Sequence, residues 1–174
     1  MRPVLGVAAV LVVAACMQAG AGSGRSKAVD VRATAIEIAP DALDGLTLLG
    51  AMELNADHPS FGGFSGLWME EGRLIAISDV GWFLFAETEA RPGGLAPTRA
   101  RMVQMRGEGG AVFDKRGGDS EGLALVDEDL VISFERDHRL MTHRQGGQLG
   151  GTVYHRDWET MSSNKGLEAL AALP

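Results

Sequence analysis

Apolar residues fall into short runs along most of the chain, and polar turn residues separate these runs. The runs are five or six residues long and cover positions 64–69, 73–78, 82–86, 121–126 and 129–134. Turn sequences such as Glu70-Glu71-Gly72 and Asp127-Glu128-Asp129 bound them. Runs of this length suit strands and are too short for helices. The pattern therefore predicts an all-β fold.

The runs recur in the same order. Phe64-Ser65-Gly66-Leu67 is followed 56 residues later by Ser120-Glu121-Gly122-Leu123, and Leu74–Asp79 is followed at the same interval by Leu130–Glu135. The match continues without a gap over about 20 positions. A third start appears at Gly166–Leu170, where Glu168 stands 47 residues after Glu121. The chain is therefore built from an internal repeat.

Paired hairpins that recur every ~40–55 residues are typical of β-propeller blades, each of which is a four-stranded sheet. We predict a partial β-propeller, with about two blades and the start of a third. A β-sandwich is the structural alternative, but it does not account for a gapless repeat. Propellers need ~4–8 blades to close, so we expect this chain to be truncated.

Two loops are expected within the blades. Arg91–Pro97, rich in Gly and Pro, predicts a long loop in the first blade, and the alternating segment Arg99–Arg106 predicts the exposed outer strand that follows. Four Gly within residues 144–151 predict a second loop in the equivalent place of the second blade.

The N-terminus has the features of a signal peptide. Met1-Arg2-Pro3 precedes Val4–Ala15, a run of twelve apolar or Gly residues, whereas a helix that spans a bilayer needs ~20. A basic start, a short apolar run and small residues after it predict export. We therefore expect a periplasmic or outer-membrane-anchored protein of a bacterium.

Two cleavage sites compete. Val13-Ala14-Ala15-Cys16 resembles a bacterial lipobox, in which Cys16, the single Cys of the chain, would be lipidated. Ala19-Gly20-Ala21 fits ordinary signal peptidase instead. We expect a signal peptide over 1–16, a flexible tether and lead-in over 17–43, and the propeller domain over 44–174. Membrane association would come only through the lipid anchor.

The charge is negative and uneven. The whole chain has a formal net charge of −7, and no acidic residue precedes Asp30. From position 29 onward, 13 basic residues face 23 acidic ones, a net charge of −10. Such a surface repels phosphate backbones, so nucleic acid is excluded as a partner. A cation, or a substrate that a cation brings in, is favoured.

An ordered set of short motifs resembles the esterase-like phytase family, whose domain is a phytase-like β-propeller. The motifs are Gly63–Leu67, Ile77–Asp79, Asp119–Ala124, Ser133–Arg136 and Asn164–Leu170. The resemblance covers about residues 44–174 and implies a secreted or periplasmic propeller with esterase or phosphoester-hydrolase activity. It supplies no catalytic set, and it implies that the family's domain continues for several more blades.

Acidic residues stand where the predicted strands begin. Glu121, Glu168 and, in the first copy, Ser65 occupy the same position, one residue before Gly-Leu or Ala-Leu. In a propeller, this equivalence places them on a ring around one end of the central channel. Asp119 stands two residues before Glu121 and points the same way in an extended chain. Convergent carboxylates suit Ca²⁺ or another divalent cation, which takes oxygen ligands.

Asp79 and Glu135 form a second equivalent pair, at the far end of the next strand. We predict the metal ligands Glu121, Glu168, Asp79 and Glu135. A cation held there could polarise a phosphoryl group or an ester carbonyl and activate water. We predict the catalytic carboxylates Glu121, Asp119 and Glu168. The alternative is that these side chains only cap turn amides.

Two functions remain open on these grounds. The first is a cation-assisted hydrolase of small ester or phosphoester substrates, which should bring three or more carboxylates with perturbed pKa values into one site. The second is a non-catalytic lipoprotein propeller that binds a protein or polysaccharide, which should expose aromatic or apolar side chains. Ser65 is a weak nucleophile candidate, because Gly63–Leu67 lacks the final Gly of a Gly-x-Ser-x-Gly elbow.

Overall fold

The computed structural model describes residues 12–14, 26–38 and 47–172 of the chain. No α-helix occurs within these residues, which confirms the predicted all-β class. None of them forms a helix long and apolar enough to cross a bilayer. The elements are β1 (Val12–Ala14), β2 (Lys27–Ala28), β3 (Val31–Ala35), β4 (Met52–Ala56), β5 (Phe64–Glu70), β6 (Arg73–Ser78), β7 (Trp82–Arg91), β8 (Gly94–Gln104), η2 (Glu108–Gly110), β9 (Ser120–Val126), β10 (Asp129–Phe134), β11 (Arg139–His143), β12 (Leu149–Val153) and η3 (Arg156–Thr160).

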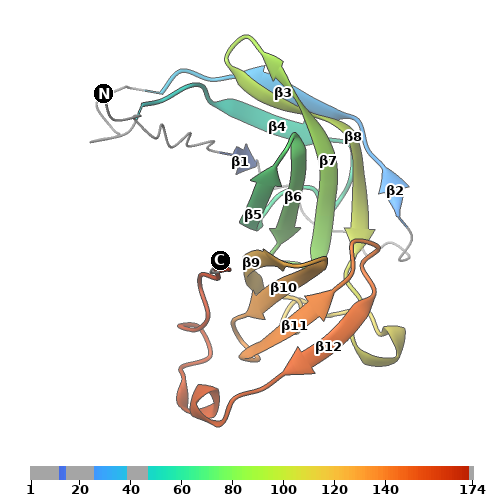
Figure 1. Cartoon of the computed structure of the whole chain (residues 1–174), viewed down its shortest axis with the longest axis vertical. Coiled ribbons are helices and arrows are strands. Elements are labelled where there is room, and N and C mark those ends of the chain that lie inside the picture. Colours follow the sequence, from blue (N-terminus) through green and yellow to red (C-terminus); the bar gives the residue numbers. More distant parts are fainter. Residues whose placement is uncertain (1–11, 15–25, 39–46, 173–174) are drawn as a thin grey trace.

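The two repeats form two antiparallel meanders of the same topology. Strands β5, β6, β7 and β8 lie in sequence order in one sheet, and β9, β10, β11 and β12 lie in sequence order in the next. Figure 1 shows the meanders one after the other, the first in green and the second in orange and brown. Strand β2 extends the first sheet beyond β8 through pairing of Lys27 with Met102. The predicted repeat is thus confirmed as a repeat of structure.

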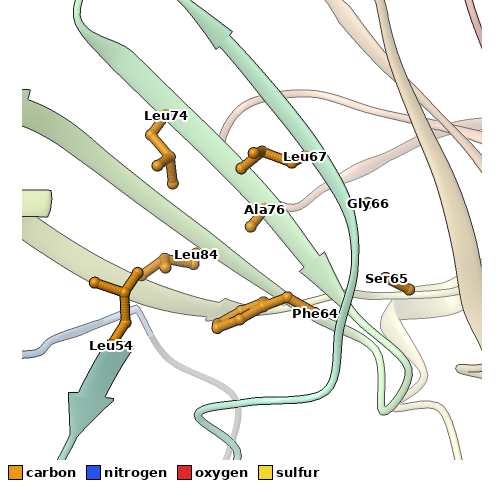
Figure 2. A pocket seen from close by; sticks show the side chains of 8 residues that line it. All are labelled: Leu54, Phe64, Ser65, Gly66, Leu67, Leu74, Ala76 and Leu84. Atoms are coloured by element: carbon orange, nitrogen blue, oxygen red, sulfur yellow. The ribbon is translucent and has the colours of Figure 1, made fainter. Parts of the chain in front are cut away.

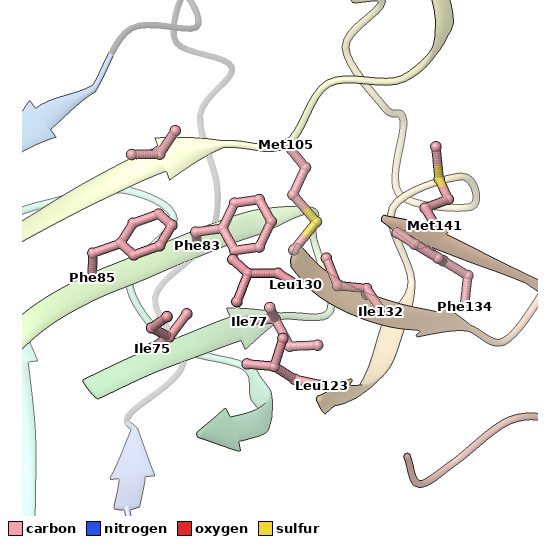
Figure 3. Close-up of a cluster of buried hydrophobic side chains, with 11 residues drawn as sticks. Ile75, Ile77, Phe83, Phe85, Met105, Leu123, Leu130, Ile132, Phe134 and Met141 are labelled. Atoms are coloured by element: carbon pink, nitrogen blue, oxygen red, sulfur yellow. The ribbon is translucent and has the colours of Figure 1, made fainter. Parts of the chain in front are cut away.

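The meanders pack against each other through a shared apolar core. Ile77, Phe83, Leu130 and Ile132 have no exposed surface, and Figure 3 shows them meeting between the two sheets. Each such side chain stabilises the fold by about 1.5–3 kcal/mol when it is fully buried. The contact between the repeats is therefore a main source of stability.

Strand β6 is buried on both of its faces. Ile75 and Ile77 point to the second meander, whereas Leu74 and Ala76 belong to a separate core cluster on the other face. That second cluster includes Leu54 and its neighbours on β4, which pairs with β3 in a hairpin. Alternate residues of a strand face opposite sides, so a continuous apolar run is what a doubly covered strand requires.

The third repeat start packs on the second repeat in the same register as the second packs on the first. A Cβ on Gly66 would lie 3.1 Å from Leu123 Cβ, and a Cβ on Gly122 would lie 3.0 Å from Leu170 Cβ. Leu170 follows Leu123 by 47 residues, the interval found in the sequence. Absence of a side chain at both Gly positions permits this close approach.

Serine hydroxyl groups donate hydrogen bonds from one repeat to equivalent backbone positions of the next. The hydroxyl of Ser65 donates to the carbonyl oxygen of Ser120, and Ser133 Oγ donates to the carbonyl oxygen of Leu167 at 2.6 Å. The two acceptors stand three residues before Leu123 and Leu170, which the close contacts above already relate. Hydrogen bonding and packing therefore agree on the register of the third repeat.

The long loop predicted at Arg91–Pro97 is wrong. Strand β7 runs to Arg91 and β8 begins at Gly94, so Pro92 and Gly93 alone connect a long hairpin. Positive φ angles at Gly93 and Gly94 allow this tight turn. The extension of β7 is mostly charged, with Glu87 paired with Arg99 at 2.7 Å, and the apolar run Leu95–Pro97 of β8 is too short to predict a strand. The outer strand expected over Arg99–Arg106 is present but begins earlier and ends at Gln104.

The loop predicted at residues 144–151 is correct only in its first part. Residues 144–148 form a turn, in which Arg144 and Gln148 are joined by a backbone hydrogen bond of 3.0 Å. Leu149–Val153 then forms β12, the outer strand of the second meander, so Gly150 and Gly151 belong to a strand. Gly150 lies at a bulge in the pairing with β11, where a Cβ would lie 2.7 Å from Thr142 Oγ1.

The N-terminal region is described only in part. Within the predicted signal peptide, Val12–Ala14 forms β1 and pairs in parallel with Met52–Leu54 of β4. The predicted lipidation site Cys16 and the alternative cleavage site at Ala19–Ala21 lie outside the described residues. The described part of the predicted lead-in contains β2 and β3.

Candidate carboxylate site

The antiparallel hairpins bring distant acidic residues to one end of the sheets. The amide of Asp79, just after β6, donates to the carbonyl oxygen of Gly63, just before β5, at 2.9 Å. The amide of Glu135, just after β10, donates to Asp119, just before β9, at the same distance. In each repeat, the end of the second strand therefore lies beside the start of the first strand. The two groups of carboxylates that the sequence predicted separately share one location.

A β-bulge directs Glu121 into this location. On β10, Phe134 pairs with Ser120 and Ser133 pairs with Gly122, so Glu121 has no partner across the ladder. The first repeat has the same irregularity, because Phe64 pairs with Ser78 and Gly66 pairs with Ile77. Bulges redirect side chains and are frequent beside active sites.

Three carboxylates converge at the start of the second meander. Oxygen atoms of Asp119, Glu121 and Glu135 lie within 4.8 Å of one another. Asp119 and Glu135 are buried, with 5% and 7% of their surface exposed, and Glu121 is partly buried. Glu168 contacts Glu135, and Asp79 interacts electrostatically with Asp119 and Glu121. We call these five residues the carboxylate cluster.

Crowding raises the pKa of several members. Burial, followed by the charges of Asp119, Glu135, Glu168 and Asp79, raises the pKa of Glu121 to about 7. Burial and the charges of Glu168 and Asp119 raise the pKa of Glu135, and a hydrogen bond with the Glu168 carboxyl raises it further. Burial also raises the pKa of Asp79, although Lys115 opposes the change. Perturbed pKa values cluster at functional sites, so these carboxylates are candidates for one.

Arg136 borders the cluster and was not predicted. Its guanidinium Nε pairs with Asp119 Oδ2, and this bond raises the pKa of Arg136 above its usual range. The side chain keeps 41% of its surface exposed, so it remains open to a ligand. The sequence signal was its place directly after Glu135, but a single Arg after a strand is too common to single out.

The donor set fits a hard divalent cation. Ca²⁺ takes carboxylate oxygens at about 2.3–2.6 Å, so two ligands of one ion can lie up to about 5 Å apart. The separation of at most 4.8 Å among Asp119, Glu121 and Glu135 satisfies this limit. These three side chains could therefore hold a metal ion. Of the predicted ligands, Glu121 and Glu135 are in this group, and Glu168 and Asp79 lie beside it.

Turn capping does not account for Asp119 and Glu135. Asp114 shows what capping looks like here, because its Oδ1 accepts a hydrogen bond of 2.6 Å from the amide of Gly117. In the cluster, Asp119 pairs with Arg136 instead, and Glu135 pairs with Glu168. Asp119 and Glu135 thus interact with charged or ionisable groups, whereas Asp79 also accepts a backbone hydrogen bond.

An apolar pocket lies on the first meander. It has a volume of about 150 Å³, and Figure 2 shows Leu54, Phe64 and Leu84 gathered at one end with Ser65 at the other. The hydroxyl of Ser65 donates to the carbonyl oxygen of Ser120, so it serves to join the repeats. None of the other residues that line this pocket is a base that could activate it. The weak nucleophile prediction for Ser65 therefore gains no support.

Comparison with known proteins gives one match. The family model described as "Phytase-like: Esterase-like activity of phytase" matches residues 59–174. The matched region includes both meanders, the third repeat start and all five residues of the carboxylate cluster. Neither the curated proteins nor the solved structures contain a significant match.

Proposed function

The chain belongs to the phytase-like family, and we propose that it hydrolyses phosphoester or carboxyl ester bonds at the carboxylate cluster. The observation that carries this proposal is the convergence of Asp119, Glu121 and Glu135 within 4.8 Å at one end of the second meander. A site that only stabilises the fold gains nothing from packing like charges together, because their repulsion destabilises the folded state.

A divalent cation, Ca²⁺ first, is the proposed cofactor. Asp119, Glu121 and Glu135 would hold it, with Glu168 and Asp79 supplying further negative charge. Such an ion would polarise the ester oxygen and lower the pKa of a bound water. The raised pKa of Glu121 supports this assignment, because a cation is the natural counter-charge for carboxylates that repel one another.

The remaining residues of the site have roles that follow from their contacts. Glu168 hydrogen-bonds the Glu135 carboxyl and lies outside the three closest carboxylates, so it is the residue proposed to accept a proton from the attacking water. Arg136 stays charged and partly exposed, and it would bind the anionic oxygen that develops as the ester bond breaks. Asp119 orients Arg136 through their ion pair.

The proposed scaffold is an incomplete β-propeller. The equal topology of the two meanders and the equal docking of the third repeat start support this architecture. The proposed site lies where the innermost strands of successive blades begin. We also propose export, with Cys16 as a lipid anchor, on the basis of the N-terminal apolar run.

The test is hydrolysis of chromogenic phosphoesters and carboxyl esters by the full chain, with Ca²⁺ and with a chelator. We expect activity that the chelator removes and that Glu121→Gln lowers by about 100-fold or more. The matched control is Glu128→Gln, which removes one exposed carboxylate from the β9–β10 turn at the opposite end of the same sheet. Inactivity on every substrate would instead support the alternative, a non-catalytic propeller that binds a protein or polysaccharide.

A further inference from the structure

A second pocket adjoins the carboxylate cluster through Arg136. It has a volume of about 280 Å³ and lies between the turn that precedes β11 and the segment around η3. Its lining includes Arg136, His138, Tyr154, His155, Trp158 and Glu159. Arg136 also pairs with Asp119, so one side chain borders both the pocket and the cluster. A ligand in the pocket would therefore sit beside the proposed reaction centre.

We propose that this pocket binds the ring of an uncharged sugar. The inference rests on the proposed function in one respect: within a substrate, this ring would be the alcohol half of the ester. Binding of the free sugar requires no hydrolysis, so the two proposals can fail separately.

The charges of the pocket disfavour an anionic ligand. The charge of Arg136 is balanced by the paired carboxylate of Asp119, and the nearby Arg139 pairs with Asp137, a lining residue, at 3.2 Å. Glu159 adds a further carboxylate on the lining. No surplus of positive charge is left among these residues to hold a free phosphate or carboxylate. The pocket therefore suits a neutral ligand with many hydroxyl groups.

The aromatic rings suit the shape of a sugar. Tyr154, His155 and Trp158 line the pocket, and Tyr154 keeps 63% of its surface exposed. The rings of His155 and Trp158 lie 5.7 Å apart with an angle of 50° between their planes, which gives a concave aromatic wall. An aromatic ring combines a flat apolar face with a polar edge or tip. Sugar rings have matching surfaces, since their C–H groups form apolar faces and their hydroxyls lie around the rim.

Hydrogen bonds fix the wall before a ligand arrives. The His155 ring accepts from the amide of Asp157 at 3.2 Å, and Thr160 Oγ1 donates to the carbonyl oxygen of Asp157 at 2.9 Å. On the other side, His138 Nε2 lies 3.1 Å from the carbonyl oxygen of Ser162. A pocket held in this way loses little conformational entropy when it binds a ligand.

The test is ligand-detected saturation-transfer NMR on the full chain, with methyl glycosides of glucose, galactose and mannose as probes. Phenol and inorganic phosphate are the competing probes, since an aromatic or anionic site would prefer them. We expect at least one glycoside to bind, with a Kd of about 1–10 mM. The variant Trp158→Ala should weaken that binding by at least about tenfold, because it removes the largest aromatic face.

Two further variants keep the result interpretable. Tyr154→Ala changes a mostly exposed side chain and should also weaken binding if Trp158→Ala fails to fold. Val153→Ala changes the exposed neighbouring residue outside the lining and should leave binding unchanged. The inference is overturned if no glycoside binds, if phenol or phosphate binds and the glycosides do not, or if the folded aromatic variants bind as the wild type does.

A cluster variant separates this inference from the proposed function. Glu121→Gln should abolish hydrolysis and still bind the glycoside. Binding of the glycoside by a wild type that hydrolyses no ester would contradict the proposed function and leave the sugar pocket standing. Hydrolysis without binding of any glycoside would support the proposed function and overturn the sugar pocket.

Discussion

The two repeats have the same strand topology and differ in the side chains at equivalent positions. Both begin with a bulged strand, and both close with a backbone hydrogen bond of 2.9 Å between the residue before the first strand and the residue after the second. The first repeat carries Ser65 at the bulge, where the second carries Glu121. The first precedes its strand with Gly63, where the second has Asp119. Chemistry in this protein is therefore decided by side chains placed on a repeated scaffold, which itself serves packing.

The largest effect should come from making the second repeat resemble the first. Glu121→Ser copies the residue of the first repeat into the bulge and removes a proposed cation ligand. We expect kcat/KM for a chromogenic ester to fall by about 100-fold or more. Steady-state kinetics measures this, with circular dichroism to confirm the fold. A variant that keeps near wild-type activity would show that the bulge position is irrelevant to chemistry.

The packing between repeats should depend on the missing side chains. Gly66→Ala would place its Cβ 2.8 Å from Ile77 Cγ1 and 3.1 Å from Leu123 Cβ. Overpacking of this kind lowers the free energy of unfolding by about 1–3 kcal/mol. Urea denaturation measures the change, and Gly151→Ala is the control, since the nearest atom would lie 3.7 Å from its Cβ. Equal stability of the two variants would refute the tight interface.

Stability should depend on pH through the carboxylate cluster. The pKa of Glu121 is about 7 in the folded chain, and its ordinary value is 4.5. Between these two pH values the folded state keeps a proton on Glu121 that the unfolded state has lost. In chelator, the contribution of Glu121 should therefore lower the melting temperature as pH rises from about 5 to 8, whereas His58 and His143, whose pKa values burial lowers, act in the opposite direction. The melting temperature of the wild type relative to that of Glu121→Gln should therefore fall over this range, and Glu128→Gln should behave as the wild type does. Thermal unfolding followed by circular dichroism tests this, and a difference between the wild type and Glu121→Gln that stays constant or rises with pH would contradict it.

The smallest effect should come from the first repeat's own bulge residue. Ser65→Ala removes the hydrogen bond to the carbonyl oxygen of Ser120. Loss of one such bond lowers the free energy of unfolding by about 0.5–1.5 kcal/mol. Catalysis should stay within about twofold of the wild type. A large loss of activity in a stable Ser65→Ala variant would return Ser65 to the list of catalytic candidates.

Sequence reasoning was strongest where the pattern is local. Strand positions such as 73–78, and the 47-residue interval between Glu121 and Glu168, follow from periodicity and repetition. All five carboxylates of the cluster were also named in advance. Their union into one site needed the antiparallel pairing of β5 with β6 and of β9 with β10, which places Asp79 and Glu135 beside the strand starts.

The features that the sequence did not predict have a common physical cause. The extended β7–β8 hairpin is held by backbone pairing and by exposed ion pairs such as Arg99–Glu87, neither of which leaves an apolar period. The ion pair of Arg136 with Asp119 joins residues 17 positions apart and depends on the β9–β10 hairpin. The aromatic pocket draws residues from the turn before β11 and from the segment around η3. Contacts of this kind become visible only once the chain is folded.

Calorimetric titration of Ca²⁺ into the full chain at pH 8 measures cation binding by the carboxylate cluster without the need for a substrate. We expect one Ca²⁺ ion to bind per chain in the wild type and in Glu128→Gln. In Glu121→Gln we expect the affinity for Ca²⁺ to fall by at least about tenfold. Absence of binding by the wild type, or equal affinity in Glu121→Gln, would contradict the claim that these carboxylates form a cation site.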